Sequence, residues 1–234
     1  MSNKRVLVLS DMHHPYGHPD MVAFLKAVKR KFKPDRVICI GDEIEGAALS
    51  FHGINPDLPS ASDELRHAID RLKPIYRLFP RVDVVESNHG SLVYRRAKHG
   101  GIPKSVIKGY REMIEAPKDW HWHDDLIIKL SDGTQCYFCH GKSNDILKVS
   151  QAQSMHCVQG HYHERFDIRY WGNPLQLYWG MTVGCLINDQ ALSFSYNKVN
   201  LRRPVIGCGI IIEGHPQLIP MVLKPGGRWT GKLV

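Results

Sequence analysis

Five short apolar runs, each ended by a polar signature, most strongly constrain what this chain can fold into. Continuous apolar runs of this length are typical of strands buried on both faces of a sheet. α/β folds place their ligands at the ends of such strands. The signatures are Asp11-Met12-His13, Gly41-Asp42, Asn88-His89, His140-Gly141 and Gly160-His161-Tyr162-His163. The pattern predicts that aspartates, an asparagine and several histidines meet at one sheet edge.

The residue types in these signatures indicate metal chemistry. Imidazole and carboxylate together suit manganese, iron, zinc, cobalt or nickel, whereas an all-oxygen set suits magnesium or calcium. A single ion takes three or four protein ligands, so this many candidates predict two divalent transition-metal ions. Two such ions can clamp a phosphoryl group for in-line displacement. Asp42 is the natural bridge, because it is central in the order and a carboxylate can give one oxygen to each ion.

The order DxH, GDxx(D/E), NH, H and GHxH resembles the calcineurin-like metallophosphoesterase superfamily over residues 11–163. The resemblance implies an α/β fold, the αββαβ sandwich of two mixed sheets flanked by helices, with a dinuclear site at the strand ends. It implies that a metal-bridging hydroxide attacks a phosphate ester in line, with manganese as the favoured metal. The implied first-metal ligands are Asp11, His13 and His163, the bridge is Asp42, and the second-metal ligands are Asn88, His140 and His161. His89 is implied to be a non-ligand that protonates the leaving oxygen or stabilises charge on the phosphoryl group.

Two departures from the family pattern bear on function. The third motif reads Ser87-Asn88-His89-Gly90, without the acidic residue that usually follows Asn-His, so the partner that orients His89 is unspecified. The Gly41–Gly46 element lacks the Asp-Arg-Gly ending of the protein serine/threonine phosphatases. Both absences count against a protein phosphatase.

The reaction predicted from these features is phosphodiester hydrolysis on a nucleotide or nucleic acid. One alternative is a phosphomonoesterase, including a protein phosphatase of the small phage type. Another is a metal-bound nucleic-acid-binding module without turnover. Four C-terminal segments also resemble small metallophosphoesterases of tailed bacteriophages: 178–180, 184–185, 196–198 and 227–229.

Charge favours an anionic phosphate-ester substrate. The formal net charge is +8, and basic residues gather just after Asn88-His89. The basic residues are Arg95, Arg96, Lys98, Lys104, Lys108 and Arg111, with Tyr94 and Tyr110 interleaved. This arrangement is typical of phosphate contact with base stacking, although a solvated helix face gives the same pattern. The predicted substrate contacts are His52, Arg95, Arg96 and Lys98.

Composition predicts one domain spanning residues 1–234, since 43% hydrophobic residues suffice for a single core, and the resemblance implies that this domain is calcineurin-like. No apolar stretch reaches the roughly 18 residues of a membrane span, and no signal peptide is recognisable. Six cysteines, mostly in apolar runs, indicate reduced core residues and a cytoplasmic location, or the host cytoplasm for a phage protein. Cys136 and Cys139, three apart on a predicted strand, are expected on opposite faces. Nothing in the sequence sets the oligomeric state.

The apolar periodicity predicts alternating strands and helices in the first half and mostly strands in the second. Helices are expected at 19–32 and 63–79, the latter kinked or broken at Pro74, and in an interrupted stretch from His89 to Glu115. His121-Trp122-His123 is expected to be surface packing. The predicted strands cover 5–10, 36–40, 82–86, 126–130, 135–139, 165–171, 175–183, 191–196, 205–213 and 217–223.

Overall fold

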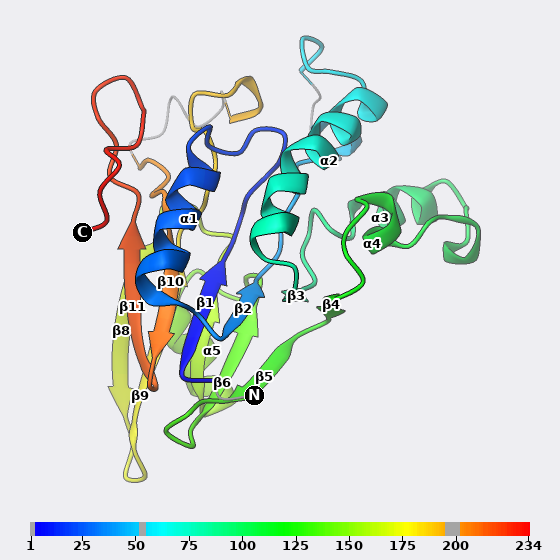
Figure 1. The fold of residues 1–234 in the computed structure, drawn as a ribbon. Coiled ribbons are helices and arrows are strands. Elements are labelled where there is room, and N and C mark those ends of the chain that lie inside the picture. The colour runs from blue at the N-terminus through cyan, green and yellow to red at the C-terminus, as the bar shows by residue number, and fades with distance from the viewer. Residues whose placement is uncertain (1–2, 52–54, 195–201) are drawn as a thin grey trace.

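The computed structural model describes residues 3–51, 55–194 and 202–234, which form two β-sheets packed face to face between helices (Figure 1). The first sheet has the order β11-β10-β1-β2-β3-β4, in which β1 to β4 are parallel and β10 is antiparallel to β1. Its strands are β1 (Arg5–Leu9), β2 (Arg36–Cys39), β3 (Val82–Val85), β4 (Trp120–His123), β10 (Gly207–Ile212) and β11 (His215–Pro220). The hairpin of β10 and β11 turns at Glu213-Gly214, as predicted.

The second sheet has the order β5-β6-β7-β9-β8. Its central strands β6, β7 and β9 are parallel, and β5 and β8 are antiparallel edges. The strands are β5 (Leu126–Lys129), β6 (Gln135–Cys139), β7 (His156–Gln159), β8 (Phe166–Gly172) and β9 (Leu177–Val183). The predicted hairpin of 126–130 and 135–139 is therefore confirmed.

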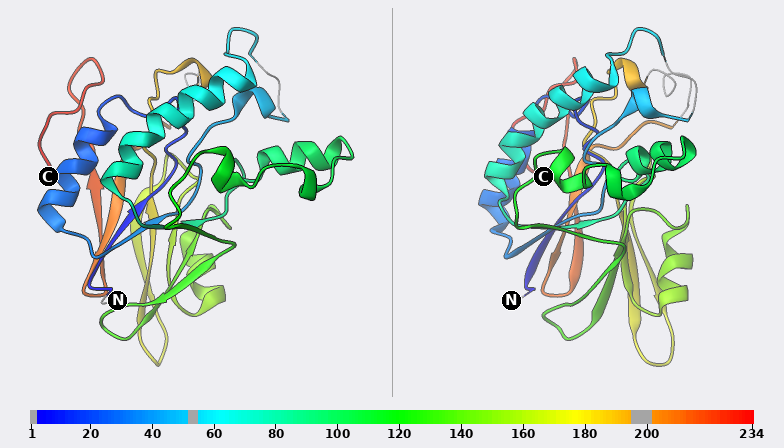
Figure 2. Two further views of the ribbon diagram at one scale, coloured as in Figure 1. Left: turned by 45° about the vertical axis from the view of Figure 1, so that its right-hand side comes forward. Right: turned by 90° about the vertical axis from the view of Figure 1, so that its right-hand side faces the viewer.

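Alternating side chains of the strands build the layers. Val8 points into the core between the sheets, where it meets Phe138 and Met181. Leu9 points the opposite way, into a core with α1 (Met21–Phe32) and α2 (Ala61–Leu78). The outer face of the second sheet is covered by α5 (Ile146–Gln153). Figure 2 shows α5 on the far side of the two sheets from α1 and α2.

The helix α2 is stabilised both by a local cap at its first turn and by tertiary packing against the sheet. Ser60 caps its first turn by accepting a hydrogen bond from the Asp63 backbone N–H at 3.2 Å. Of the kink or break predicted at Pro74, the break is wrong, because α2 is one element from 61 to 78. Leu72 and Ile75, on either side of the proline, are fully buried. Packing of both halves on the sheet outweighs the backbone hydrogen bond that proline removes.

Three further segments differ from the sequence-based expectation. The predicted strand at 191–196 is wrong for its described part, where Phe194 packs on Cys185 and Ile187 instead of pairing in a sheet. The helix α5 was not predicted, although the parallel pair β6 and β7 requires a crossover. The strand β4 was not predicted either: Trp120 is buried, His121 is exposed, and both belong to the sheet edge next to β3.

The expectations about the cysteines and about a membrane span can be compared with the structure. All six cysteines are buried and unpaired. Cys136 lies in the core between the sheets and Cys139 lies under α5, which confirms that they occupy opposite faces. Within the described residues, no helix combines the length and the apolar character needed to cross a membrane.

The parallel strands carry the predicted signatures to one edge. β1, β2 and β3 run in the same direction, so the segments that follow Leu9, Cys39 and Val85 emerge side by side. The same holds for β6 and β7 in the second sheet. Short helices complete this end of the molecule: η1 (Ala47–Leu49), α3 (Leu92–His99), η2 (Lys104–Val106) and α4 (Tyr110–Met113).

Candidate metal centre

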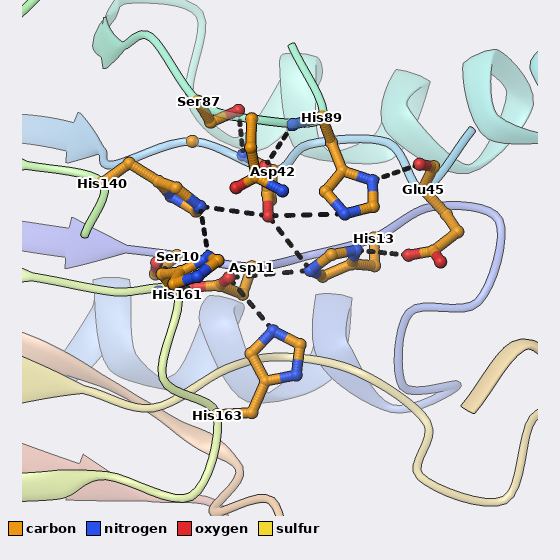
Figure 3. A network of polar contacts seen from close by, with 12 residues as sticks. Ser10, Asp11, His13, Asp42, Glu45, Ser87, His89, His140, His161 and His163 are labelled. Atoms are coloured by element: carbon orange, nitrogen blue, oxygen red, sulfur yellow. Dashed lines mark hydrogen bonds and ion pairs between the residues drawn. The ribbon is translucent and has the colours of Figure 1, made fainter. Parts of the chain in front are cut away.

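The segments after five strands bring the predicted ligands together (Figure 3). Ten of the residues drawn are labelled, and the five histidines among them surround the carboxylates of Asp11 and Asp42. Asn88 is exposed and lines a hollow of about 420 Å³ together with His140 and His161. The predicted ligand set therefore converges on one place from two sheets.

The backbone at these strand ends is held in an uncommon conformation. Asp11, His13, Asp42 and His161 have positive φ angles of 51°, 45°, 56° and 68°. Residues other than glycine rarely adopt this left-handed region, and those that do cluster at functional sites. Cross-strand hydrogen bonds fix the loops: the Asp11 N–H donates to the Gly41 carbonyl at 3.1 Å, and the His13 N–H donates to the Asp42 carbonyl at 2.9 Å.

The glycine before His161 is required by close approach. A Cβ at Gly160 would overlap the Ser10 hydroxyl and a carboxylate oxygen of Asp11. The same Asp11 oxygen, Oδ2, accepts hydrogen bonds from the Ser10 hydroxyl and from the His161 N–H, the latter at 2.9 Å. The Gly-His element of the last motif thus locks the second sheet against the first at the predicted ligand Asp11.

Asp42 lies between two groups of potential ligands. In the first group, His163 Nε2 is 3.1 Å and His13 Nε2 is 3.6 Å from Asp11 Oδ1. Asp42 Oδ2 is 3.4 Å from His13 Nε2 on that side and 3.2 Å from His140 Nε2 on the other. His161 completes the second group with Asp42 and His140. This is the position that a bridging carboxylate needs.

The hydrogen bonds of two histidines fix which ring nitrogen faces the carboxylates. His13 Nδ1 donates to Glu45 Oε2 at 2.5 Å, and His140 Nδ1 donates to the Ile40 carbonyl at 2.8 Å. In a neutral imidazole the other nitrogen, Nε2, then carries a lone pair. Both Nε2 atoms face Asp42, and His13 Nε2 is buried with no hydrogen-bond partner. Lone pairs that converge on a carboxylate are stabilised by positive charge between them, which a proton or a metal ion can supply, so these residues fit metal ions.

The pKa shifts point to the same excess of negative charge. Burial lowers the pKa of His140, but the Asp42 carboxylate more than offsets this and raises it to about 9. Burial likewise lowers the pKa of His13, yet Glu45 and Asp11 raise it well above its usual range. Burial raises the pKa of Asp42, but the surrounding histidines hold it well below its usual range. The carboxylates thus stay ionised and attract positive charge.

The partner of His89 that the sequence leaves unspecified is a backbone group. His89 Nδ1 donates to the backbone carbonyl of Glu45, and the His89 N–H donates to Asp42 Oδ1 at 3.1 Å. The other ring nitrogen, Nε2, lies 4.0 Å from Asp42 Oδ2, and the side chain is 23% exposed. His89 therefore faces the centre with an oriented ring that remains open to solvent.

The Ser87 side chain connects the loop that carries Asp42 with its own loop. Its hydroxyl oxygen accepts hydrogen bonds from the backbone N–H groups of Asp42 and Gly90, both at 3.0 Å. Sequence reasoning missed the roles of Ser87 and Glu45. The carboxylate of Glu45 could have been noticed as the acidic end of the GDxx(D/E) element. The backbone carbonyl of Glu45, which accepts from His89, could not, because nothing in a sequence marks a backbone acceptor.

Two of the predicted substrate contacts, Arg95 and Arg96, donate hydrogen bonds to backbone carbonyls of the protein itself. Arg95 Nη2 donates to the Asn88 carbonyl at 2.7 Å. Arg96 donates to the carbonyls of Leu49 and Ser50 and lies over the Phe51 ring. Contact of these two arginines with a substrate stays a prediction.

The remaining members of the basic stretch differ in position. Lys98 is exposed on α3, and His52 lies outside the described residues. Tyr110 is wrongly predicted as a stacking residue, because its hydroxyl donates to Glu43 Oε2 at 3.0 Å and its ring packs against Trp122. Tyr94 is partly exposed with Lys104 over its ring.

No protein-family model and no curated protein matches this sequence. Solved structures do match. Vps29 from Chaetomium thermophilum is 10% identical with a TM-score of 0.51, over 99% of this chain and 95% of that one. Vacuolar Protein Sorting 29 from Cryptosporidium parvum is 12% identical with a TM-score of 0.51, over 100% and 96%.

A further match is Yfce, a phosphoesterase from E. coli, at 11% identity and a TM-score of 0.48, over 98% of this chain and 96% of that one. At such low sequence identities, a structural match is evidence for a shared fold alone. The two Vps29 structures share the arrangement of two mixed sheets flanked by helices, so the fold class predicted from the motifs is confirmed.

Proposed function

We propose that this chain, which has the calcineurin-like metallophosphoesterase fold, is a dinuclear metal-dependent phosphoesterase. One observation carries the proposal. The Nε2 atoms of His13 and His140 converge on Asp42 Oδ2 from opposite sides, and each ring is held by a hydrogen bond at its Nδ1. Histidines oriented in this way are typical of metal ligands.

The chain offers donors for two ions. Asp11, His13 and His163 would hold one and Asn88, His140 and His161 the other, with Asp42 shared between them. We favour manganese on the family resemblance, and the donor set equally suits iron, zinc, cobalt or nickel. When bound, two divalent ions supply Lewis-acid activation of water and of the phosphoryl oxygens.

His89 is proposed as the proton donor to the leaving oxygen, or as a stabiliser of charge on the phosphoryl group. The Glu45 carbonyl accepts a hydrogen bond from His89 Nδ1, which leaves Nε2 as the nitrogen that faces the centre. The partial exposure of the ring allows it to exchange a proton with solvent. General acid catalysis needs both an oriented group and a proton supply.

We favour a phosphodiester of nucleotide or nucleic-acid type as the substrate. The net charge of +8 supports an anionic substrate, and the missing Asp-Arg-Gly element counts against a protein phosphatase. A phosphomonoesterase is the alternative within the same chemistry, and a non-catalytic nucleic-acid-binding module is the alternative outside it. A cytoplasmic location and a phage origin stay predictions from the sequence.

A substrate panel tests this proposal. The protein is loaded separately with manganese, zinc, cobalt or nickel and assayed on bis-p-nitrophenyl phosphate, p-nitrophenyl phosphate and DNA. We expect a higher kcat/KM on the diester than on the monoester with at least one metal. Asp42→Asn is the control that removes metal-dependent turnover. A preference for the monoester would instead support a phosphatase, and metal-loaded protein inactive on every substrate would support the non-catalytic module.

A further inference from the structure

The strand β8 forms an open edge of the second sheet (Figure 1). It has seven residues and no proline, and no strand of the described residues pairs with its outer side. The other edge strands are short or carry proline: β4 and β5 have four residues each, and β11 contains Pro216 and Pro220. An open edge like that of β8 presents backbone N–H and C=O groups with which another strand can pair.

The side chains of β8 alternate between an apolar row and a charged row. In the apolar row, Ile168 packs against the core between the sheets, and Tyr170 is 54% exposed. Asp167 and Arg169 lie on the opposite face, towards α5, where Arg169 Nη1 donates to Asp145 Oδ1 at 2.6 Å. The Asp167 carboxylate has no hydrogen bond or ion pair with any residue that the structure describes. The edge therefore carries one paired cation and one unpaired anion, two residues apart.

This pattern is complementary to an antiparallel copy of itself. When two copies of a strand pair about a two-fold axis, the residue at the axis lies opposite itself, and residues equally far before and after it lie opposite each other. With Ile168 at the axis, Asp167 of each copy lies opposite Arg169 of the other, and Phe166 lies opposite Tyr170. Opposite charges and aromatic pairs in such positions both stabilise an antiparallel pair of strands.

Charge disfavours the neighbouring registers. An axis at Asp167 would place two carboxylates opposite each other, and an axis at Arg169 would place two guanidinium groups opposite each other. Like charges in directly opposite positions destabilise a strand pair. The ion pair with Asp145 does not prevent Arg169 from contacting a second carboxylate, because a guanidinium group has five N–H donors. The register centred on Ile168 is therefore favoured over both of its neighbours.

We propose that β8 pairs with β8 of a second copy of this chain, antiparallel and centred on Ile168. The two five-stranded sheets then form one continuous sheet across a two-fold axis. The partner is a second copy because the charged row of β8 is complementary to itself. β8 begins three residues after His163, so the antiparallel arrangement places the two candidate metal centres at opposite ends of the joined edge. The proposal concerns association alone and does not rest on phosphoesterase activity.

Sedimentation velocity of the whole chain at several concentrations tests the proposal. We expect the wild type to form a reversible dimer. Asp167→Arg and Arg169→Asp should each weaken the dimer by about 30-fold or more, because two cross-strand charge pairs of about 1 kcal/mol each are lost. Lys26→Asp, on the exposed face of α1, makes the same change in net charge as Arg169→Asp and should leave the dimer unchanged. A wild type that is monomeric at every concentration would overturn the proposal.

A mixture of the two variants tests the register. At positions 167 and 169, Asp167→Arg carries two positive charges and Arg169→Asp two negative charges, so each repels itself and attracts the other. An equimolar mixture should therefore dimerise with about the affinity of the wild type. Circular dichroism checks that both variants fold. If Arg169→Asp does not, Arg169→Gln should still dimerise more weakly than the wild type. Folded single variants that dimerise as the wild type does, or a mixture that stays monomeric, would contradict the proposed pairing.

Discussion

The backbone carbonyl of Glu45 accepts a hydrogen bond from Nδ1 of His89, and the carboxylate of the same residue accepts one from Nδ1 of His13. The Ser193 hydroxyl donates to the other carboxylate oxygen of Glu45 at 3.0 Å, which fixes the side chain. One residue therefore orients a proposed metal ligand with its side chain and the proposed acid with its main chain. Substitution at position 45 should separate the two effects.

Glu45→Ala should weaken metal binding by about 10–100-fold, the usual cost of removing the partner of a metal-ligating histidine. The His89 bond should persist, because the backbone carbonyl remains. Glu45→Gln should recover part of the affinity, since its amide oxygen can accept from His13 Nδ1. Competition with a fluorescent chelator measures the affinities. Wild-type affinity in Glu45→Ala would show that the carboxylate does not support the ligand.

His89→Ala should retain the metals and lose activity by about 10²–10⁴-fold, as expected for loss of a general acid. The loss should be smaller when the leaving group is p-nitrophenolate, which needs no proton. Metal content and kcat are measured together, with His121→Ala on the exposed part of β4 as the matched control. Because candidate ligand atoms of His89, His13 and Asp42 lie within 4.8 Å of one another, loss of metal in His89→Ala would reassign His89 as a ligand.

The fold and the ligand set were predictable because one physical pattern encodes both. A strand buried on two faces must be apolar along its length, so a polar residue such as Asp11 or Asp42 marks where the strand leaves the sheet. Parallel strands then bring these ends together without information from any other residue. The order of the motifs was enough to place Asp42 between the two groups.

What the sequence could not show depends on contacts that carry no residue signature. The Glu45 carbonyl that orients His89 is a backbone group that every residue possesses. The edge strand β4 reads Trp-His-Trp-His and has no apolar run of the kind that marks β2 and β3, so the sequence pattern could not distinguish it from a loop. The hydrogen bonds of Arg96 could not be foreseen for a similar reason. Its acceptors, the carbonyls of Leu49 and Ser50, come close to it only after the chain folds.

Lys98→Ala offers the cleanest test of a nucleic-acid track, because Arg95 and Arg96 hold backbone carbonyls. If Lys98 contacts a phosphate, the variant should bind DNA more weakly, and the log–log salt slope should fall by roughly one unit. Hydrolysis of bis-p-nitrophenyl phosphate should not change. Lys148→Ala, on the exposed face of α5, is the matched control. Identical DNA binding in both variants would indicate that Lys98 lies on a solvated helix face and contacts no phosphate.

The buried His156 should make stability depend on pH independently of any metal. Its Nδ1 accepts the Trp179 N–H at 3.1 Å, and its ring stacks on Trp179 at 4.6 Å. Burial lowers the pKa of His156 below its ordinary value of 6.5. Protonation is thus easier in the unfolded chain, and the stability present above pH 6.5 is lost as the pH falls through the lower folded-state pKa.

Urea unfolding at about pH 7.5 and about pH 5.5 measures this loss. His156→Gln keeps an acceptor for the Trp179 N–H but does not titrate, so its free energy of unfolding should fall less than that of the wild type. His121→Gln, at an exposed position, should follow the wild type. Parallel pH profiles in wild type and His156→Gln would refute this assignment.

The metal content of the purified chain tests the central claim most directly. After reconstitution with excess manganese and removal of free ion, elemental analysis of the wild type should approach two ions per chain. Asp42→Ala should lose more metal than loss of a peripheral ligand such as His161 or His163, because Asp42 lies between both groups. A content of one ion or less per wild-type chain would contradict the dinuclear centre.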